Sequence, residues 1–384
     1  MRKKVAIFGS TGSIGQSTLQ VIRDNPNLFE VVTLVAGRNS SLLYDQIRDF
    51  HPKHVYIQRH EDAIDLYNSL FYLPNARMSM EEIYYGDEGL DEISSIYDFD
   101  IAVSALVGIA GLKPTFNLIM SGKEVALANK EVLVTGGRFI LAHAKKHNCK
   151  LIPIDSEHSA IMQCLQGESQ NSIDKILLTA SGGPFLTRDL TTDITVDDVL
   201  KHPTWKMGKK VSVDSATMMN KGFEVIEASL LFDIYPRNIQ VVVHRQSIVH
   251  SAVQFKDGTI MANLSPTDMR IPIAYALNFP NRIKNSIERV DLFKLLNLTF
   301  EKPDLNKFPC LEYAYSALKS GLDKQIILNA ANEVAVEKFL KKEINFNSIP
   351  ALIYTVLDSW LTSIDIDSIE TILELDADVR NLMN

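Results

Sequence analysis

A glycine-rich turn near the start of the chain constrains its fold more than any other feature. Residues 5–8 read Val-Ala-Ile-Phe, typical of a short buried strand, and Gly-Ser-Thr-Gly-Ser-Ile-Gly follows directly at 9–15. The residues after this turn, Gln-Ser-Thr-Leu-Gln-Val-Ile-Arg, have the pattern of a helix. A strand, a glycine turn and a helix in this order form the context that a dinucleotide-binding fingerprint requires. Glycines let the backbone approach a pyrophosphate, and the helix N-terminus offers free N–H groups.

The glycine spacing is Gly-x-x-Gly-x-x-Gly rather than Gly-x-Gly-x-x-Gly, and a tight structural turn is the alternative interpretation. The second predicted strand, 30–36, bears on the choice of cofactor because it ends in Gly37-Arg38-Asn39. NAD enzymes commonly hold the ribose 2′-hydroxyl with an Asp or Glu near this point. A cation with small donors beside it suits a 2′-phosphate, so we expect NADP(H). The alternative is an Arg in a surface loop.

The N-terminal region continues as an alternation of strands and helices, which predicts a parallel sheet covered by helices. Further strands are expected at 54–58, 100–105 and 125–128. Asn129-Lys130-Glu131 follows the last of these strands, at the edge where open α/β sheets bind ligands. Lys130 could contact a substrate or nicotinamide, and Asn129 and Glu131 could contact the cofactor. The run also suits a helix start, with Asn as the cap.

A pair of carboxylates follows the next predicted strand, 150–154, in the run Asp155-Ser156-Glu157-His158. On an extended segment Asp155 and Glu157 point to one face, where they repel each other unless a cation lies between them. Ligation by oxygen alone suits Mg²⁺ or Mn²⁺ rather than zinc. A helix cap is the alternative interpretation of the pair.

The stretch 202–227 combines an aromatic residue with several polar side chains. Trp205 and Met207 are expected to form a lid that excludes water from a bound substrate. The hydrogen-bond donors after them suit a phosphate, and the carboxylate of Glu224 suits a divalent cation; these donors are Ser215, Asn220 and Lys221. The alternative is a polar loop before a capped surface helix, with Trp205 as a packed anchor.

Ser181 lies in a second glycine turn, Ser181-Gly182-Gly183, after a strand predicted at 176–180, and it is a candidate phosphate contact. Alternating strands at 240–243, 248–255 and 259–264 favour an antiparallel or mixed sheet. His244 and His250 lie among these strands, and whether either reaches the substrate stays open. From about residue 286 glycine becomes rare, and helical spacing recurs at 326–340, 349–361 and 364–382.

Composition excludes several classes of protein. The chain has 384 residues and a net charge of −8, which argues against general nucleic-acid binding because basic residues are not in surplus. The three cysteines, Cys149, Cys164 and Cys310, lack metal-ligand spacing and fit reduced thiols in a cytosolic protein. The start of the chain has too short an apolar run for a signal peptide, and the stretch 101–112 is too short to span a bilayer.

These motifs together resemble the 1-deoxy-D-xylulose 5-phosphate reductoisomerase family of the non-mevalonate isoprenoid pathway. The resemblance rests on the runs at 9–15, 128–131, 155–158, 181–185, 202–208 and 213–224, with Asn-Ala-Ala-Asn-Glu-Val-Ala at 329–335. The runs come in the family's order. Arg38 stands where many members have Lys, which keeps the positive charge.

The resemblance implies a role for each matching residue. NADPH would bind at Thr11, Gly12, Ser13, Ile14, Gly37, Arg38, Asn39, Asn129, Glu131 and Gly208. The metal ligands would be Asp155, Glu157 and Glu224. The substrate would bind at Lys130, Ser156, Ser181, His202, Ser215, Asn220 and Lys221. The catalytic set would be Lys130, Asp155, Glu157, Glu224 and His202. The family also implies a homodimer and a location in the bacterial cytoplasm or in plastids.

The predicted fold class is α/β, with a Rossmann-like doubly wound parallel sheet, a central α+β catalytic domain and a C-terminal helical bundle. We expect an NADPH-binding domain at 1–150, a catalytic and metal-binding domain at 151–285 with a lid at about 186–210, a linker at 286–312 and a helical domain at 313–384. The expected partner is a small phosphorylated sugar, without nucleic acid or membrane.

Two other classes of function compete with this prediction. A plain NADP-dependent dehydrogenase of the semialdehyde type needs an activated Cys, and none of the three cysteines has a recognisable nucleophile context. A non-catalytic NADP-sensing protein would need neither three carboxylates nor a phosphate site. A requirement for divalent metal separates the first alternative from the family's reaction, and turnover excludes the second.

Overall fold

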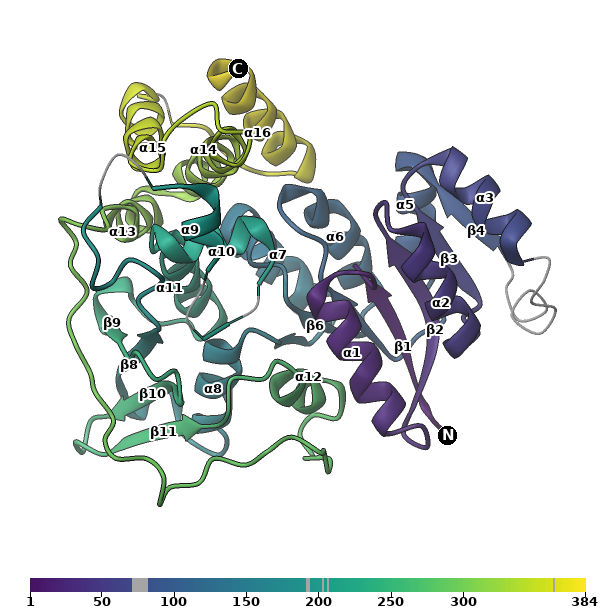
Figure 1. Ribbon diagram of the computed structural model, residues 1–384, viewed down its shortest axis with the longest axis horizontal. Coiled ribbons are helices and arrows are strands. Elements are labelled where there is room, and N and C mark those ends of the chain that lie inside the picture. The colour runs from purple at the N-terminus through teal and green to yellow at the C-terminus, as the bar shows by residue number, and fades with distance from the viewer. Residues whose placement is uncertain (71–81, 191–193, 202–203, 206, 362) are drawn as a thin grey trace. The chain divides into compact units, whose positions relative to one another are not determined.

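The computed structural model describes residues 1–70, 82–190, 194–201, 204–205, 207–361 and 363–384. The chain divides into two compact units (Figure 1). Unit 1 comprises Met1–Asn129, Ile140–Asp155 and Met269–Ser286, and unit 2 comprises Lys130–Phe139, Ser156–Asp268 and Ile287–Asn384. The four-part division expected from the sequence stays a prediction.

Unit 1 is built on a seven-stranded sheet whose described strands all run parallel, in the order β4-β3-β2-β1-β5-β6-β7. The strands are β1 (Lys3–Phe8), β2 (Phe29–Ala36), β3 (His54–Ile57), β4 (Glu82–Tyr85), β5 (Ile101–Ser104), β6 (Glu124–Leu127) and β7 (Leu151–Pro153). The central strands carry nearly continuous buried apolar runs, as expected for a sheet covered on both faces. The doubly wound parallel sheet predicted from the sequence is therefore confirmed.

The helices of unit 1 follow the strands along the chain, with one exception. They are α1 (Ser13–Asp24), α2 (Ser40–Phe50), α3 (His60–Leu70), α5 (Gly86–Ser94), α6 (Leu112–Met120) and α12 (Arg270–Leu277), with a 3₁₀ turn at Ile109–Gly111. Helix α12 is the exception, because it comes from far along the chain and packs against α1. The ammonium of Lys3 donates a hydrogen bond to the carbonyl of Leu277 at 3.0 Å, which fastens the end of α12 to the first strand.

Unit 2 contains a four-stranded mixed sheet in the order β11-β10-β8-β9. Its strands are β8 (Ile173–Ala180), β9 (Ile239–Val243), β10 (Val249–Phe255) and β11 (Ile260–Leu264). β8 pairs parallel with β9, whereas β10 pairs antiparallel with both β8 and β11. Helix α8 (Ser156–Cys164) packs on β10 and β11. The mixed sheet agrees with the alternating pattern of the sequence.

The longest of the remaining helices of unit 2 is α14 (Leu322–Leu340). The others are α9 (Val196–Leu200), α10 (Lys209–Ala216), α11 (Met219–Leu231), α13 (Cys310–Ser320), α15 (Ser348–Ser359) and α16 (Ile369–Met383), with 3₁₀ turns at Gln170–Ser172 and Pro236–Asn238. α14 contacts α10, α13, α15 and α16, and it is buried on most of its faces. Figure 1 shows α14, α15 and α16 together at the yellow end of the chain, which confirms the predicted helical C-terminal region.

The extents of two helices, α7 and α10, could not be read from the sequence pattern. Helix α7 (Lys130–Lys146) begins in unit 2 and ends in unit 1, and its backbone is not helical at Gly137. The stretch 202–227 was expected to be a lid with one helix start, but it contains both α10 and the first part of α11. Met218 separates these two helices because its φ of 60° lies in the left-handed region.

Candidate functional site

The glycine turn lies where the strand order of unit 1 reverses, between β1 and β5. Gly9 follows β1 with a φ of +98°, and a Cβ there would lie 2.4 Å from the carbonyl oxygen of Ala105. Only glycine allows both this backbone conformation and this close approach. Helix α1 begins after Gly12 without a side-chain cap and without an acidic residue in its first turn. Its first N–H groups are therefore suited to an anion at the usual ligand position of such sheets.

The end of β2 lies beside this turn, because the backbone N–H of Gly9 donates to the carbonyl of Val35 at 2.9 Å. Arg38 follows β2 and is exposed. The side chain of Asn39 accepts a hydrogen bond from the N–H of Leu42 at 3.1 Å and so caps α2. A cation beside the glycine turn, without a carboxylate among residues 37–41, supports a cofactor with a 2′-phosphate.

Asn129 lies at the carboxyl end of β6 and is almost fully buried. Its amide donates hydrogen bonds to the carbonyl oxygens of Leu106 at 2.5 Å and Gly108 at 3.1 Å. These bonds hold the loop that follows β5. Asn129 therefore shapes the ligand edge of the sheet, whichever contact it makes with a cofactor.

The predicted metal ligands come together. Asp155, Glu157 and Glu224 each offer a carboxylate oxygen, and these atoms lie within 4.8 Å of one another. Asp155 immediately precedes α8, Glu157 lies in the first turn of α8, and Glu224 lies on α11 with an exposure of 1%. A triad of oxygen donors, partly buried and triply negative, fits Mg²⁺ or Mn²⁺.

Two lysines partly neutralise these carboxylates. The ammonium of Lys221 contacts Glu224 and lies 3.1 Å from Oε1 of Glu157, and that of Lys130 lies 3.4 Å from Oε1 of Glu224. Asn220 donates to Glu224 at 2.5 Å. The substrate-binding candidates Lys130, Asn220 and Lys221 thus adjoin the candidate metal ligands.

The ring of His158 contacts the backbone of Glu224. Its ring is fully buried, and Nε2 lies 3.0 Å from the backbone carbonyl of Glu224, while Nδ1 lies 3.9 Å from a carboxylate oxygen of Glu227. The hydroxyl of Ser156 donates to the carboxylate of Glu157. These contacts hold the backbone of Glu224 and the carboxylate of Glu157.

The second glycine turn approaches α10. Gly182 and Gly183 both have positive φ, and a Cβ on Gly183 would lie 2.7 Å from the carbonyl oxygen of Ser215. The turn that carries Ser181 therefore lies against the backbone of Ser215. Both hydroxyl-bearing residues were predicted to contact a phosphate, and the approach of Gly183 to Ser215 brings the turn of Ser181 to α10.

The lid is described only in part. His202 lies outside the described residues, so its predicted substrate contact stays a prediction. Trp205 and Met207 are half-buried, and the ring of Trp205 lies 6.0 Å from that of His250, edge to face. Gly208 is exposed and caps α10.

The ring of His244 is held by contacts within the fold. Its Nδ1 lies 2.9 Å from the carbonyl of Thr299, its Nε2 accepts from the N–H of Ile248 at 3.2 Å, and its ring stacks on Phe300. Both ring nitrogens are thus used within the fold. His250 contacts the carbonyl of Ser265 through Nε2 at 3.1 Å as well as the ring of Trp205.

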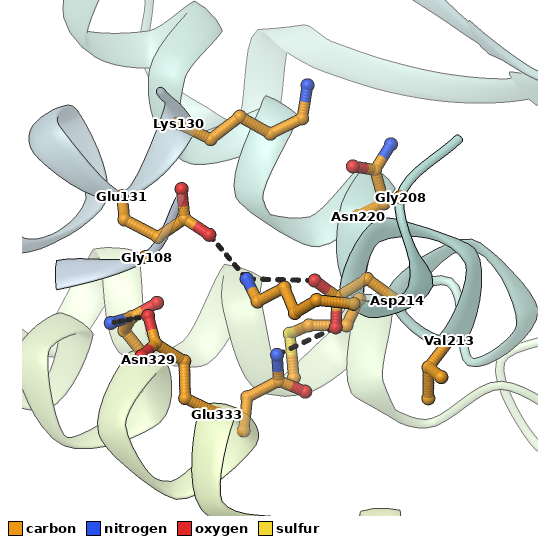
Figure 2. Close-up of polar contacts among 12 residues, drawn as sticks. Gly108, Lys130, Glu131, Gly208, Val213, Asp214, Asn220, Asn329 and Glu333 are labelled. Carbon is orange, nitrogen blue, oxygen red and sulfur yellow. Dashed lines mark hydrogen bonds and ion pairs between the residues drawn. The ribbon is translucent and has the colours of Figure 1, made fainter. Parts of the chain in front are cut away.

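The sequence reasoning missed a buried charged cluster on α10. The ammonium of Lys210 lies 2.5 Å from Glu131 and 2.9 Å from Asp214. In Figure 2, dashed lines lead from the carboxylates of Glu131 and Asp214 to this one shared ammonium. Asn332 of α14 donates to the other carboxylate oxygen of Asp214 at 2.8 Å. The spacing of Lys210 and Asp214, four residues apart on one helix face, was the only local signal of this cluster.

Burial and charge oppose each other in this cluster. Burial alone would raise the pKa of Glu131, but Lys210 outweighs it and holds this pKa below its ordinary value. The pKa of Asp214 is raised, because its burial outweighs Lys210 and Asn332. Burial would lower the pKa of Lys210, but Asp214 and Glu131 raise it well above the ordinary value. The Lys210–Glu131 pair is therefore ionised at neutral pH.

The cysteines do not supply a nucleophile. All three are free and buried. Burial raises the pKa of the Cys149 and Cys310 thiols to about 12 and that of Cys164 to about 11. Because the thiolate is the reactive form, these values argue against a dehydrogenase that uses a cysteine nucleophile. No helix in the described part of the chain is both long and apolar enough to cross a membrane.

The fold and the site define a class: an α/β protein with a dinucleotide-type glycine turn and a separate site of three carboxylates beside lysine and hydroxyl donors. Family models place it more narrowly. Residues 5–137 match the model for 1-deoxy-D-xylulose 5-phosphate reductoisomerase, residues 151–232 match the model for the C-terminal domain of that enzyme, and residues 264–382 match the DXP reductoisomerase C-terminal domain. The chain belongs to the 1-deoxy-D-xylulose 5-phosphate reductoisomerase family.

Individual relatives agree over nearly the whole chain. A 1-deoxy-D-xylulose 5-phosphate reductoisomerase from Clostridium perfringens is 48% identical over 380 residues, 98% of each chain. One from Chloroherpeton thalassium is 49% identical over 383 residues, 98% of this chain and 96% of the relative. A crystal structure of DOX-P reductoisomerase in complex with NADPH, fosmidomycin and magnesium has a TM-score of 0.93 at 40% identity, covering 99% of this chain and 97% of the other.

Proposed function

We propose that this chain converts 1-deoxy-D-xylulose 5-phosphate and NADPH into 2-C-methyl-D-erythritol 4-phosphate, a step of isoprenoid precursor biosynthesis that needs a divalent metal. The observation that carries the proposal is the grouping of Asp155, Glu157 and Glu224 within 4.8 Å in a chain that also has a dinucleotide-type glycine turn. Hydride transfer alone does not require three converging carboxylates. A rearrangement of the carbon skeleton does, because negative charge develops on adjacent oxygens of the substrate.

Asp155, Glu157 and Glu224 would hold the metal, either Mg²⁺ or Mn²⁺. When bound, the metal supplies Lewis acidity toward the ketone and hydroxyl oxygens of the substrate. The protein's own part is to keep the ligands in place. His158 fixes the backbone of Glu224, and Ser156 holds Glu157 through its hydroxyl.

NADPH would bind at the N-terminus of α1. The residues that would hold it are Thr11, Gly12, Ser13, Ile14, Gly37, Arg38, Asn39, Asn129, Glu131 and Gly208. The cofactor supplies the hydride when bound. The uncapped helix end would bind the pyrophosphate, and the exposed guanidinium of Arg38 would attract the 2′-phosphate.

The substrate would be oriented by donors that adjoin the metal ligands. Ser156, Ser181, His202, Ser215, Asn220 and Lys221 would hold it, several of them at its phosphate, and Lys130 would contact the reacting end. Lys221 has a second task in the same site, since it contacts Glu157 and Glu224 and offsets their repulsion. Trp205 and Met207 would cover the bound substrate and exclude water from reactive fragments.

The chain is also proposed to work as a homodimer in the cytoplasm. β11 is an edge strand of its sheet, and its outward residues Ile260 and Leu264 are 53% and 40% exposed. Phe293 and Leu296, in the segment between α12 and α13, are 100% and 97% exposed. An exposed edge strand with apolar side chains, together with such a segment, is the kind of surface that a second copy of the chain covers.

The dimer can be tested by light scattering after size exclusion. Phe293→Glu should shift the mass from twice the chain toward that of a single chain. Leu361→Glu places the same charge at a residue that is 90% exposed elsewhere in unit 2, and it should leave the mass unchanged. A wild-type protein with the mass of one chain at micromolar concentration would refute the dimer.

The reaction is tested by following the carbon skeleton of the product by NMR. The branched sugar phosphate should form from 1-deoxy-D-xylulose 5-phosphate only when both NADPH and divalent metal are present. The branched aldehyde, 2-C-methyl-D-erythrose 4-phosphate, should be reduced directly. A linear reduced sugar phosphate with an unrearranged skeleton would refute the proposal and leave a plain dehydrogenase.

A further inference from the structure

Of the cluster around Lys210, only Glu131 has a role so far, as a proposed contact of NADPH. Its members come from three separate stretches of unit 2: Glu131 lies in the first turn of α7, Lys210 and Asp214 lie on α10, and Asn332 lies on α14. The exposed fractions of the side chains are small, 8% for Glu131, 15% for Lys210 and 2% for Asp214. One ammonium thus serves two carboxylates in a region with little water.

Buried ion pairs are weak evidence for stability, because the cost of removing charges from water can exceed their mutual attraction. Here one ammonium faces two carboxylates, so it offsets the cost of burying them less well than a matched pair would. Such a cluster does define geometry, because Lys210 can satisfy Glu131 and Asp214 together only when α10 and the start of α7 hold one relative position within unit 2.

Several functional candidates lie close to the cluster along the chain. Glu131 follows Lys130, and Lys210 lies two residues after Gly208, at the end of the lid. Asp214 precedes Ser215. The direct contact of the Lys210 ammonium, however, is with Glu131, the residue assigned to the cofactor.

We propose that Lys210 is a positioning residue for NADPH: held by Asp214, which Asn332 holds in turn, it fixes the carboxylate of Glu131 in the orientation that contacts the cofactor. The inference rests on the proposed use of NADPH. Lys210 acts through Glu131 and is not itself a cofactor ligand. The ionised state of Glu131, which Lys210 maintains against burial, fits a carboxylate that accepts hydrogen bonds.

The test measures NADPH binding without turnover, by the change in NADPH fluorescence. Lys210→Met removes the charge and keeps most of the side-chain volume, and it should raise the Kd for NADPH about tenfold, as expected when one partner of a buried charge pair is lost. Lys209→Met is the matched control, because Lys209 is the adjacent residue on the same helix and is exposed. It should leave the Kd unchanged. Lys210→Arg keeps the charge and should restore most of the affinity.

A double-mutant cycle separates positioning from general loosening of the fold. If Lys210 acts through Glu131, then Lys210→Met should change the Kd by less than about twofold in a Glu131→Gln background. The KM for the sugar phosphate and the Mn²⁺ concentration for half-maximal activity should also change little. An equal loss in both backgrounds, or a parallel change of all three constants, would overturn the proposal.

If Lys210→Met does not fold, a second variant tests the positioning role of Lys210. Asp214→Asn preserves shape and keeps an acceptor for Asn332, but it removes the charge that holds Lys210 on α10. It should raise the Kd for NADPH about threefold, because the shared ammonium loses one of its two anchors. An unchanged Kd would refute the inference. A wild-type protein that binds no NADPH in this assay would refute the proposed function instead.

Discussion

Gly222 offers a sharp test of how packing supports the metal ligands. It lies on α11 between Lys221 and Glu224, on the face that packs against α13. A Cβ at this position would lie 2.6 Å from the Cβ of Ala314 and 3.4 Å from the carbonyl oxygen of Cys310. The change Gly222→Ala therefore inserts one methyl group into a closed helix–helix contact.

The size of the effect follows from these distances. Carbon atoms in contact lie about 3.5–4.0 Å apart, so α11 and α13 must separate by about 1 Å. The Cβ of Ala314 is bonded directly to the backbone and cannot rotate away. Overpacking of this kind costs about 1–3 kcal/mol. Replacing a glycine within a helix gains about 1 kcal/mol, which leaves a net loss of about 1 kcal/mol in the free energy of unfolding.

The same displacement should weaken metal binding, because Glu224 moves with α11 while Glu157 stays on α8. We expect the affinity for Mn²⁺, measured by calorimetry, to fall about tenfold, the order of loss seen when the support of a ligand is disturbed. Chemical denaturation measures the stability. The compensating change Ala314→Gly removes the obstructing methyl and should restore the metal affinity of the Gly222→Ala protein.

The reasoning fails if Gly222→Ala stabilises the protein by about the full helix-propensity gain of 1 kcal/mol and binds Mn²⁺ as the wild type does. That outcome would mean that α11 and α13 are loose enough to accept a methyl group. It would also mean that the position of Glu224 does not depend on their contact.

Three further predictions concern charge. Arg38→Asp should weaken NADPH far more than NADH, because it replaces attraction by repulsion at the 2′-phosphate; an unchanged preference would assign that phosphate to another residue. Asp155→Asn should abolish turnover at ordinary Mg²⁺ concentrations and leave NADPH binding nearly intact, and full activity in this variant would exclude the metal role. Asp98→Asn should lower stability at pH 7 by less than about 1 kcal/mol, because the carboxylate is partly exposed. Lys4 and Lys53 lower the pKa of Asp98 from 3.8 to about 2, so its contribution is complete above about pH 4 and is lost as the pH falls through 2; urea titrations at pH 7 and pH 2 measure the difference.

Local sequence patterns predicted the parts of the fold in which neighbours along the chain decide the structure. Each strand of the parallel sheet that was expected from an apolar run is present, with bounds shifted by a residue or two, because burial on both faces requires such runs. The glycine turn after β1 was equally visible, since Gly9 is required by a local backbone conformation. Asp155 and Glu157 could be paired for the same reason, being two residues apart.

Elements that depend on distant partners were harder to predict. Helix α12 packs against α1 in unit 1, although α1 ends at Asp24 and α12 begins only at Arg270. No helix was predicted at 270–277 from the sequence. Helix α10 was missed because it is short and its composition is polar, so its tertiary contacts outweigh its weak local preference.

The lysines at 209 and 210 show that local sequence patterns do not predict which of two adjacent residues is shielded from solvent. Two identical adjacent residues have different environments. Lys209 is exposed, whereas the side chain of Lys210 is 15% exposed, because Lys210 shares a helix face with Asp214 and this face meets α14. The amide that meets it, Asn332, is fully buried in a helix whose other buried residues are mostly apolar. A buried amide needs a hydrogen-bond partner, so an Asn inside an apolar helical segment predicts a polar group facing it from elsewhere in the chain. The run 329–335 carried that signal in the sequence, and the structure identifies its partner as Asp214, beside the predicted substrate contact Ser215. The C-terminal helices therefore contribute more than packing, because through Asn332 they hold the helix on which cofactor and substrate contacts are predicted.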